Sequence, residues 1–249
     1  MRVLFTAELG WTNRWFKWLD ERSNEYDLVA IAGDFINVFR PEPPNVQILK
    51  AKAFLRSLAR KTRVAISSGN HDTVDEVDSS SRGPVPMWMA ALDSINTLVS
   101  DGRTSVVRQR LIVTTLSYIS TIDRKRLWLT EGAELRKMTN LPWLVIHHHP
   151  PAFRGSAGPE ELLAGKLLEE FEPTLWLAGR FFDHAHPRGF TWMQTIDQSV
   201  VFNVSQTLIG AVFREAAFPN HIVFDLKSGR IQWNSWLQAE NEERVLELS

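Results

Sequence analysis

Residues 64–72 are Val64-Ala65-Ile66-Ser67-Ser68-Gly69-Asn70-His71-Asp72, a hydrophobic run that ends in a glycine and three polar side chains. The hydrophobic run is typical of a buried strand, and the glycine lets the backbone turn sharply where that strand ends. In open α/β sheets, ligands bind outside the carboxyl ends of the strands. Asn70 offers a neutral oxygen ligand, and His71 can donate a proton or bind an anionic oxygen. The stretch therefore predicts a ligand site at a sheet edge.

Outward from this stretch, buried strands alternate with amphipathic helices, which indicates βαβ units and a largely parallel sheet. We expect strands at 3–5, 28–32, 64–66, 105–107, 111–116, 143–146 and 175–178, and helices at 46–60, 88–95, 124–138 and 160–171. Residues 200–204, 221–226 and 230–236 are predicted to be antiparallel strands that complete a second sheet. No internal repeat or low-complexity linker divides the sequence, so residues 1–249 are expected to form a single domain.

Charge is nearly balanced, with 28 basic and 29 acidic residues, so the sequence shows no electrostatic footprint for nucleic acid. The chain has no cysteine, which excludes disulfides, thiolate metal sites and cysteine nucleophiles. No apolar run approaches the roughly 20 residues that span a bilayer. The first residues enter a strand-like run without the pattern of a signal peptide. We therefore expect a cytoplasmic protein without a membrane partner; its oligomeric state stays open.

Polar clusters follow four of the expected strands: Gly33-Asp34, Gly69-Asn70-His71-Asp72, the histidines at 147–149 and Asp183-His184-Ala185-His186. Six of the seven histidines lie in these clusters, which random scatter would not produce. Carboxylate, amide oxygen and imidazole ligands together suit a divalent ion such as Mn²⁺, Fe²⁺ or Zn²⁺. Such an ion can activate water and neutralise phosphate oxygens.

The series Gly-Asp, Gly-Asn-His-Asp, His-x-Pro and His-x-His, in this order and roughly this spacing, resembles the calcineurin-like metallophosphoesterases. The resemblance covers about residues 3–205. It implies an α/β fold in which two mixed sheets pack face to face and are flanked by helices, a four-layer αββα sandwich. It also implies two metal ions at the strand ends. Asp34 would bridge the two metals, Asn70 would bind the second, and His71 would donate a proton or orient the phosphate.

The remaining two motifs imply further metal ligands. In His-x-Pro the ligand precedes proline by two residues, which selects His148; His147 is the alternative if the strand ends earlier. His184 and His186 resemble the family's final histidine pair, with His184 directed at the second metal and His186 at the first.

The first motif departs from the family, which has Asp-x-His after its first strand. Here the matching positions hold Ala7 and Leu9, and neither side chain can bind a metal. Glu8 lies between them, but strand alternation is expected to point it to the other face. Only a local bulge would bring it back.

The last motif also departs, because the family has Gly-His-x-His directly after the strand and this chain has Gly179-Arg180-Phe181-Phe182. Either a short insertion carries His184 and His186 outward, or Arg180 and Phe182 occupy the ligand positions; we favour the insertion. Arg180 is then a candidate phosphate clamp, since its planar guanidinium suits phosphate oxygens.

These departures predict a site with one divalent ion, because the first metal would keep too few ligands. We expect a hydrolase for a small phosphoester, acting as a phosphodiesterase or phosphatase, with much weakened activity. The alternative is an inactive protein of the same fold that binds a phosphorylated ligand or a protein partner. A Rossmann-type cofactor binder is disfavoured, because no G-x-G-x-x-G follows the first strand.

Overall fold

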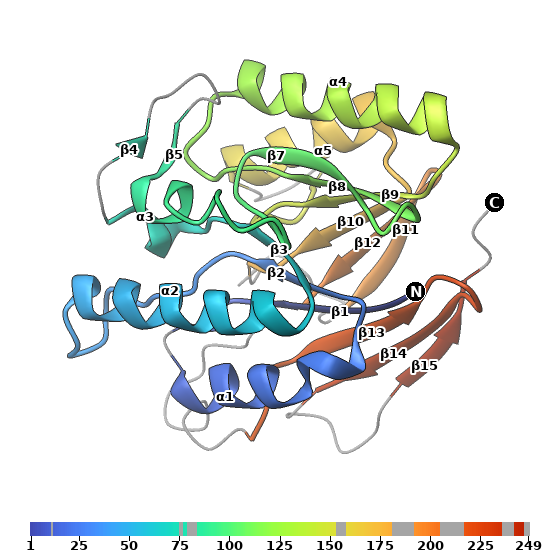
Figure 1. The fold of residues 1–249 in the computed structure, drawn as a ribbon. Coiled ribbons are helices and arrows are strands. Elements are labelled where there is room, and N and C mark those ends of the chain that lie inside the picture. The colour runs from blue at the N-terminus through green and yellow to red at the C-terminus, as the bar shows by residue number, and fades with distance from the viewer. Residues whose placement is uncertain are drawn as a thin grey trace.

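The computed structural model describes residues 1–10, 12–74, 77–78, 84–152, 158–180, 192–204, 217–235 and 242–246. Two sheets pack face to face, and helices cover the outer face of each, so the architecture is a four-layer αββα sandwich (Figure 1). This confirms the predicted fold class.

Within the described residues, the first sheet has seven strands in the order β15-β14-β13-β1-β2-β3-β6. Its parallel part consists of β1 (Arg2–Ala7), β2 (Leu28–Ala32), β3 (Arg63–Ser67) and β6 (Leu98–Val99). The antiparallel part consists of β13 (His221–Asp225), β14 (Arg230–Asn234) and β15 (Glu242–Val245). The carboxyl ends of β1, β2 and β3 therefore lie side by side.

The second sheet, as far as the structure describes the chain, has six strands in the order β11-β12-β10-β9-β8-β7. Its four central strands run parallel to one another: β8 (Leu111–Thr115), β9 (Trp143–Ile146), β10 (Leu175–Ala178) and β12 (Ser199–Asn203). The edge strands β7 (Arg103–Val107) and β11 (Met193–Ile196) are antiparallel to their neighbours. A separate pair joins β4 (Val77–Asp78) to β5 (Val85–Pro86).

The predicted pairing of the last third of the chain was wrong in two respects. β12 is parallel to β10, whereas we expected antiparallel pairing there. β13 and β14 are antiparallel as expected, but they extend the first sheet from β1, with Phe5 opposite Ile222, and do not belong to the second. Hydrophobic patterning identifies such strands but does not specify their partners, which the topology of the whole chain decides.

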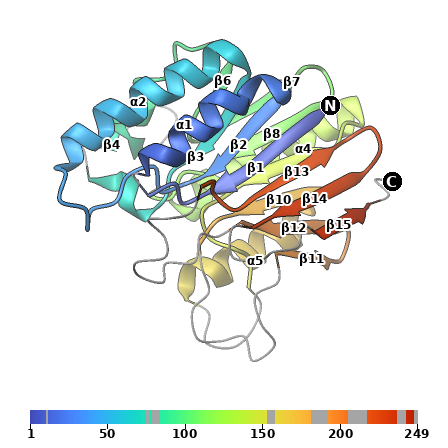
Figure 2. The ribbon, with the colours of Figure 1, turned by 90° about the horizontal axis from the view of Figure 1, so that it is seen from below.

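Helices α1 (Asn13–Arg22), α2 (Pro44–Lys61) and α3 (Met87–Ala90) cover the first sheet, and α4 (Ile122–Thr139) and α5 (Pro159–Phe171) cover the second. Figure 2 shows α1 and α2 side by side across the first sheet. The helix predicted at 88–95 is shorter than expected, because α3 ends at Ala90 and turns follow it. Two short 3₁₀ helices occupy Ser23–Glu25 and Asn70–Thr73. Within the described part of the chain, no helix combines the length and apolar character that a membrane crossing needs.

Three hydrophobic cores separate the four layers. The core between the sheets includes Phe5, Phe202 and Phe224, whose rings stack or tilt against one another within 6.4 Å. The parallel strands are buried on both faces, which explains why they appear in the sequence as continuous hydrophobic runs.

His221, at the start of β13, generates a prediction on stability. Its ring lies 4.7 Å from that of Trp18, its Nδ1 donates to the carbonyl of Pro219, and burial lowers its pKa to about 4. The unfolded chain therefore binds a proton between the ordinary histidine pKa and pH 4, while the folded chain does not. Above about pH 6.5 the ring is neutral in both states, and the free energy of unfolding does not depend on it. As the pH falls from about 6.5 to 4, the free energy of unfolding decreases by roughly 3 kcal/mol, because the unfolded state binds the proton first.

We expect the urea midpoint of the wild type to fall between pH 7 and pH 4.5, and His221→Phe to reduce that slope. Unfolding followed by tryptophan fluorescence at a series of pH values measures both slopes. Equal slopes in the two proteins would contradict the account.

Candidate metal centre

The carboxyl ends of three strands of the first sheet meet those of two strands of the second at one edge of the sandwich. The segments that follow β1, β2 and β3 lie opposite those that follow β9 and β10. Backbone hydrogen bonds join the segments within each sheet, from Glu8 N to the Gly33 carbonyl (2.9 Å) and from Arg180 N to the His148 carbonyl (2.9 Å). All the polar clusters that the sequence singled out, within the described residues, follow these strands.

The segment after β2 is held by Asp72, whose side chain is fully buried. Its carboxylate accepts hydrogen bonds from four backbone N–H groups, those of Asp34 (2.8 Å), Phe35 (2.9 Å), Ile36 (3.3 Å) and Gly69 (2.9 Å). Burial and the charge of Asp34 raise the pKa of Asp72, whereas backbone hydrogen bonds act in the opposite direction. Asp72 therefore joins the ends of β2 and β3 without facing the site.

Position 33 requires glycine for two reasons, its left-handed backbone and the atoms that surround it. Gly33 has φ +77°, and a Cβ there would lie 2.6 Å from Nδ1 of His148 and 2.8 Å from the Cα of Gly69. Because no side chain fits between these groups, the two sheets approach each other closely at this point.

Asp34 comes next and also adopts a left-handed backbone, with φ +54°. Such a conformation costs a non-glycine residue of order 1–3 kcal/mol, so the surrounding contacts must hold it. Its Oδ1 accepts the backbone N–H of His71 at 2.9 Å, and its Oδ2 lies 3.5 Å from Nε2 of His148.

His148 is fully buried and oriented by its neighbours. Its Nδ1 lies 3.2 Å from the carbonyl of Ala32, and since a carbonyl only accepts, Nδ1 carries the proton. Burial lowers the pKa of His148, which favours the neutral ring. Nε2 is then an unprotonated ligand atom, 3.0 Å from Oδ1 of Asn70. Metal-binding histidines are oriented in the same way in proteins generally, by donation from the other ring nitrogen.

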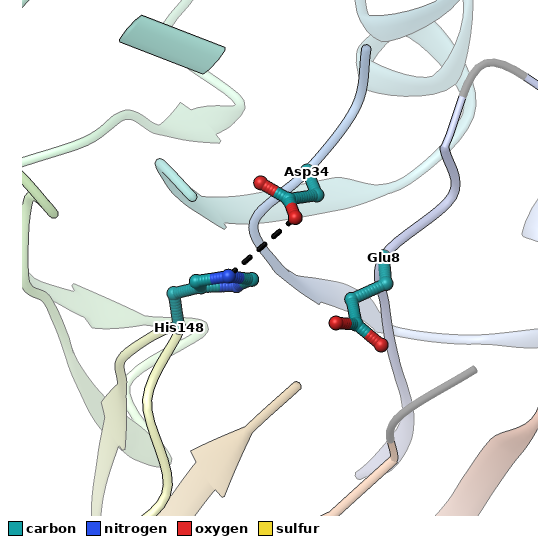
Figure 3. A group of neighbouring side chains, drawn as sticks. All are labelled: Glu8, Asp34 and His148. Carbon is teal, nitrogen blue, oxygen red and sulfur yellow. Dashed lines mark ion pairs between the residues drawn. The ribbon is translucent and has the colours of Figure 1, made fainter. Parts of the chain in front are cut away.

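Glu8 is placed differently from our expectation. β1 ends at Ala7, and Glu8 takes a left-handed backbone with φ +47°, so strand alternation no longer decides its direction. One ligand atom from each of Glu8, Asp34 and His148 lies within 4.8 Å of the other two (Figure 3). The sequence signal for Glu8 was its position as the first charged residue after a buried strand, at the same edge as Asp34.

The two positions that match the family's first motif, Ala7 and Leu9, both lie in hydrophobic cores. Ala7 belongs to the core between the sheets, where its Cβ would clash with a Cβ at Gly179. Leu9 packs in the core between the first sheet and its helices.

His147, the alternative to His148, has its ring 5.9 Å from that of Trp176 and donates from Nδ1 to the carbonyl of His149. His184 and His186 lie outside the described residues.

His71 lies on the 3₁₀ helix after β3, partly exposed. The backbone N–H of Val38 donates to its Nδ1 at 3.3 Å, so the proton of the neutral ring is on Nε2. The ring of Phe39 meets it edge-on at 5.3 Å. The ring of His71 therefore offers Nε2–H as a hydrogen-bond donor, and the backbone of His71 is bonded to Asp34.

Arg180 follows β10 and is also brought to this edge. Its Nη1 donates to Nε2 of His149 at 3.2 Å. Its backbone N–H donates to the carbonyl of His148 at 2.9 Å, which holds Arg180 beside the cluster. The structure thus brings together Asp34, Asn70, His71, His148 and Arg180 from the sequence prediction and adds Glu8.

The donor set fits a divalent ion. Two carboxylates, one amide oxygen and one neutral imidazole match the ligands that such ions take in proteins. Manganese, iron and zinc all accept these ligand types.

Comparison with known proteins gives an independent view of this arrangement. The family model described as calcineurin-like phosphoesterase matches residues 3–179. The crystal structure of TT1561 of Thermus thermophilus is similar with a TM-score of 0.63 at 12% identity, covering 94% of this chain and 98% of that one. The purple acid phosphatase PPD1 from yellow lupin (Lupinus luteus) seeds is similar with a TM-score of 0.56 at 10% identity, covering 98% of this chain and 52% of that one.

Identities this low show a shared fold alone. No curated protein matches the sequence significantly. The family match ends at Gly179, short of the segment that contains His184 and His186.

The geometry predicts that Mn²⁺ binding depends on Glu8 as well as on Asp34 and His148. Glu8→Gln keeps the size of the side chain but removes its charge, so we expect the affinity for Mn²⁺ to fall by at least the roughly 10- to 100-fold that loss of a residue supporting a ligand costs. Isothermal titration calorimetry measures the affinity, with Glu131→Gln on the exposed face of α4 as the matched control. An affinity in Glu8→Gln equal to that of the control would remove Glu8 from the ligand set.

Proposed function

The chain belongs to the calcineurin-like phosphoesterase family, and from this premise we propose that it hydrolyses a small phosphoester with the help of a single divalent ion. The observation that carries the proposal is the convergence of Glu8, Asp34 and His148 at the strand ends. Asn70 adds its Oδ1 to the same space, 3.0 Å from His148. These four residues would hold the ion.

Charge balance supports one ion over two. Glu8 and Asp34 contribute two negative charges, and the other ligands, Asn70 and a neutral His148, contribute none. This total matches one divalent cation. Ala7 and Leu9, which stand where the family has metal ligands, offer none. When bound, the ion would supply positive charge that activates water and neutralises phosphate oxygens.

His71 would orient the bound phosphoester by donating a hydrogen bond to one of its oxygens. Its Nδ1 accepts from the backbone of Val38, so the ring offers Nε2–H to a bound ester. The backbone N–H of His71 is bonded to Oδ1 of Asp34, which fixes the position of the ring relative to the metal ligands. Removing one such preorganised donor typically costs about 10²- to 10³-fold in kcat.

Arg180 would bind the phosphate oxygens. A guanidinium has five N–H donors in a fixed plane, and the structure uses Nη1 for His149. The cation would compensate in part for the positive charge of a second ion.

A second candidate function is ligand binding without turnover. The loss of ligand types at Ala7 and Leu9 favours it, since a weaker metal centre activates water less. In that case the centre would bind a phosphorylated small molecule or protein.

Hydrolysis of bis(p-nitrophenyl) phosphate, with and without added Mn²⁺, tests the proposal. We expect turnover that requires the metal, disappears in Asp34→Asn, and falls by about 10²- to 10³-fold in kcat in His71→Phe, which keeps a ring but removes its N–H donor. Absence of turnover above the Asp34→Asn level with Mn²⁺, Fe²⁺ and Zn²⁺ alike would overturn the hydrolase proposal and leave ligand binding as the function.

A further inference from the structure

His149, the third histidine of the run after β9, connects two charged residues from different elements. Its Nδ1 lies 2.7 Å from Oε1 of Glu161, and its Nε2 lies 3.2 Å from Nη1 of Arg180. A guanidinium can only donate, so Nε2 is an acceptor, and the proton of the neutral ring is on Nδ1. Arg180 therefore donates to His149, and His149 donates to Glu161. We call these three residues the positioning triad.

Two members of the positioning triad, His149 and Glu161, are buried. His149 is 2% exposed and Glu161 is 9% exposed. The ring of Tyr118 stacks on that of His149, with centroids 5.5 Å apart and an interplanar angle of 18°. Burial without partners would be costly for an imidazole and a carboxylate, and the two hydrogen bonds offset that cost.

Glu161 is itself anchored at the start of α5. It lies in the first turn of the helix, where the helix dipole favours a negative charge. Its backbone carbonyl accepts the N–H of Ala152 at 2.9 Å, which joins α5 to the segment after β9. The far end of the positioning triad is therefore part of the rigid scaffold.

Arg180 is held at its backbone as well as at its side chain. The N–H groups of Gly179 and Arg180 both donate to the carbonyl of His148, at 3.1 and 2.9 Å. His148, a residue of the metal centre, therefore fixes the backbone of Arg180, and the next residue, His149, fixes its guanidinium. A residue fixed at both ends loses little further entropy when it binds a ligand.

The intervening imidazole also keeps the guanidinium available. A direct carboxylate partner would commonly engage two guanidinium N–H groups in a bidentate pair. Through the ring of His149, the carboxylate of Glu161 orients Arg180, while the hydrogen bond to the ring uses only Nη1 of the guanidinium.

We propose that His149 and Glu161 are positioning residues that aim the guanidinium of Arg180 at the phosphate group bound beside the metal centre. The inference rests on the proposed function, because it assumes that a phosphoester or its analogue binds there. It assigns a role to the histidine and the glutamate that the metal centre does not use.

The test is a double-mutant cycle on the binding of phenylphosphonate, a non-hydrolysable ester analogue, measured by calorimetry with Mn²⁺ present. We expect Arg180→Ala and His149→Ala each to weaken binding about tenfold, and the double variant to be no weaker than Arg180→Ala alone. His149→Gln can accept from Arg180 and donate to Glu161, so it should restore most of the affinity. Mn²⁺ affinity should not fall in any of them, because none removes a metal ligand and the loss of the Arg180 charge favours the binding of a cation.

Glu161→Ala provides a milder variant in case His149→Ala folds poorly. We expect it to weaken phenylphosphonate binding about threefold, whereas Glu169→Ala, on the exposed face of α5, should have no effect.

The inference would be overturned if the losses of phenylphosphonate affinity in Arg180→Ala and His149→Ala added up in the double variant. Wild-type affinity in both Arg180→Ala and Glu161→Ala would overturn it as well. The proposed function would stand in either case. Failure of the wild type with Mn²⁺ to bind phenylphosphonate would overturn the proposed function and this inference with it.

Discussion

The buried carboxylate of Asp72 accepts four backbone hydrogen bonds, and the arrangement of the metal centre depends on them. Three of the donors belong to the turn after β2, and this turn places Asp34 in its left-handed conformation. The fourth comes from Gly69, at the end of β3. Since buried N–H groups without partners cost about 1–3 kcal/mol each, one side chain stabilises a turn that would otherwise be strained. Asp34 can therefore face His148 across the two sheets.

Much of the architecture follows from the sequence because its strands are buried on both faces. Runs such as Leu28–Ala32 and Trp143–Ile146 are hydrophobic throughout, and each is followed by glycine or histidine at the sheet edge. The positions of Asp34, Asn70 and His148 at one edge follow from this pattern and from the family motifs. Strand partners do not follow, because β13 pairs with β1 from the opposite end of the chain and no local period encodes that choice.

Glu8 shows where strand alternation fails at the site itself. Alternation holds only while the backbone stays extended, and a single left-handed residue at position 8 ends it. The hydrogen bonds from Glu8 N to Gly33 and from Gly10 N to Asp34 then couple the two turns that contain the carboxylates. Such a conformation depends on partners distant in sequence, so it could not be inferred from residues 7–9. The same holds for His149, whose two partners come from α5 and from the end of β10.

The central claim is that Glu8, Asp34, Asn70 and His148 hold one divalent ion. Anomalous diffraction from crystals of the protein grown with Mn²⁺ tests it most directly. The account predicts one manganese peak, bound by these four side chains. Two peaks of comparable height, or a single peak that none of the four side chains ligates, would contradict it.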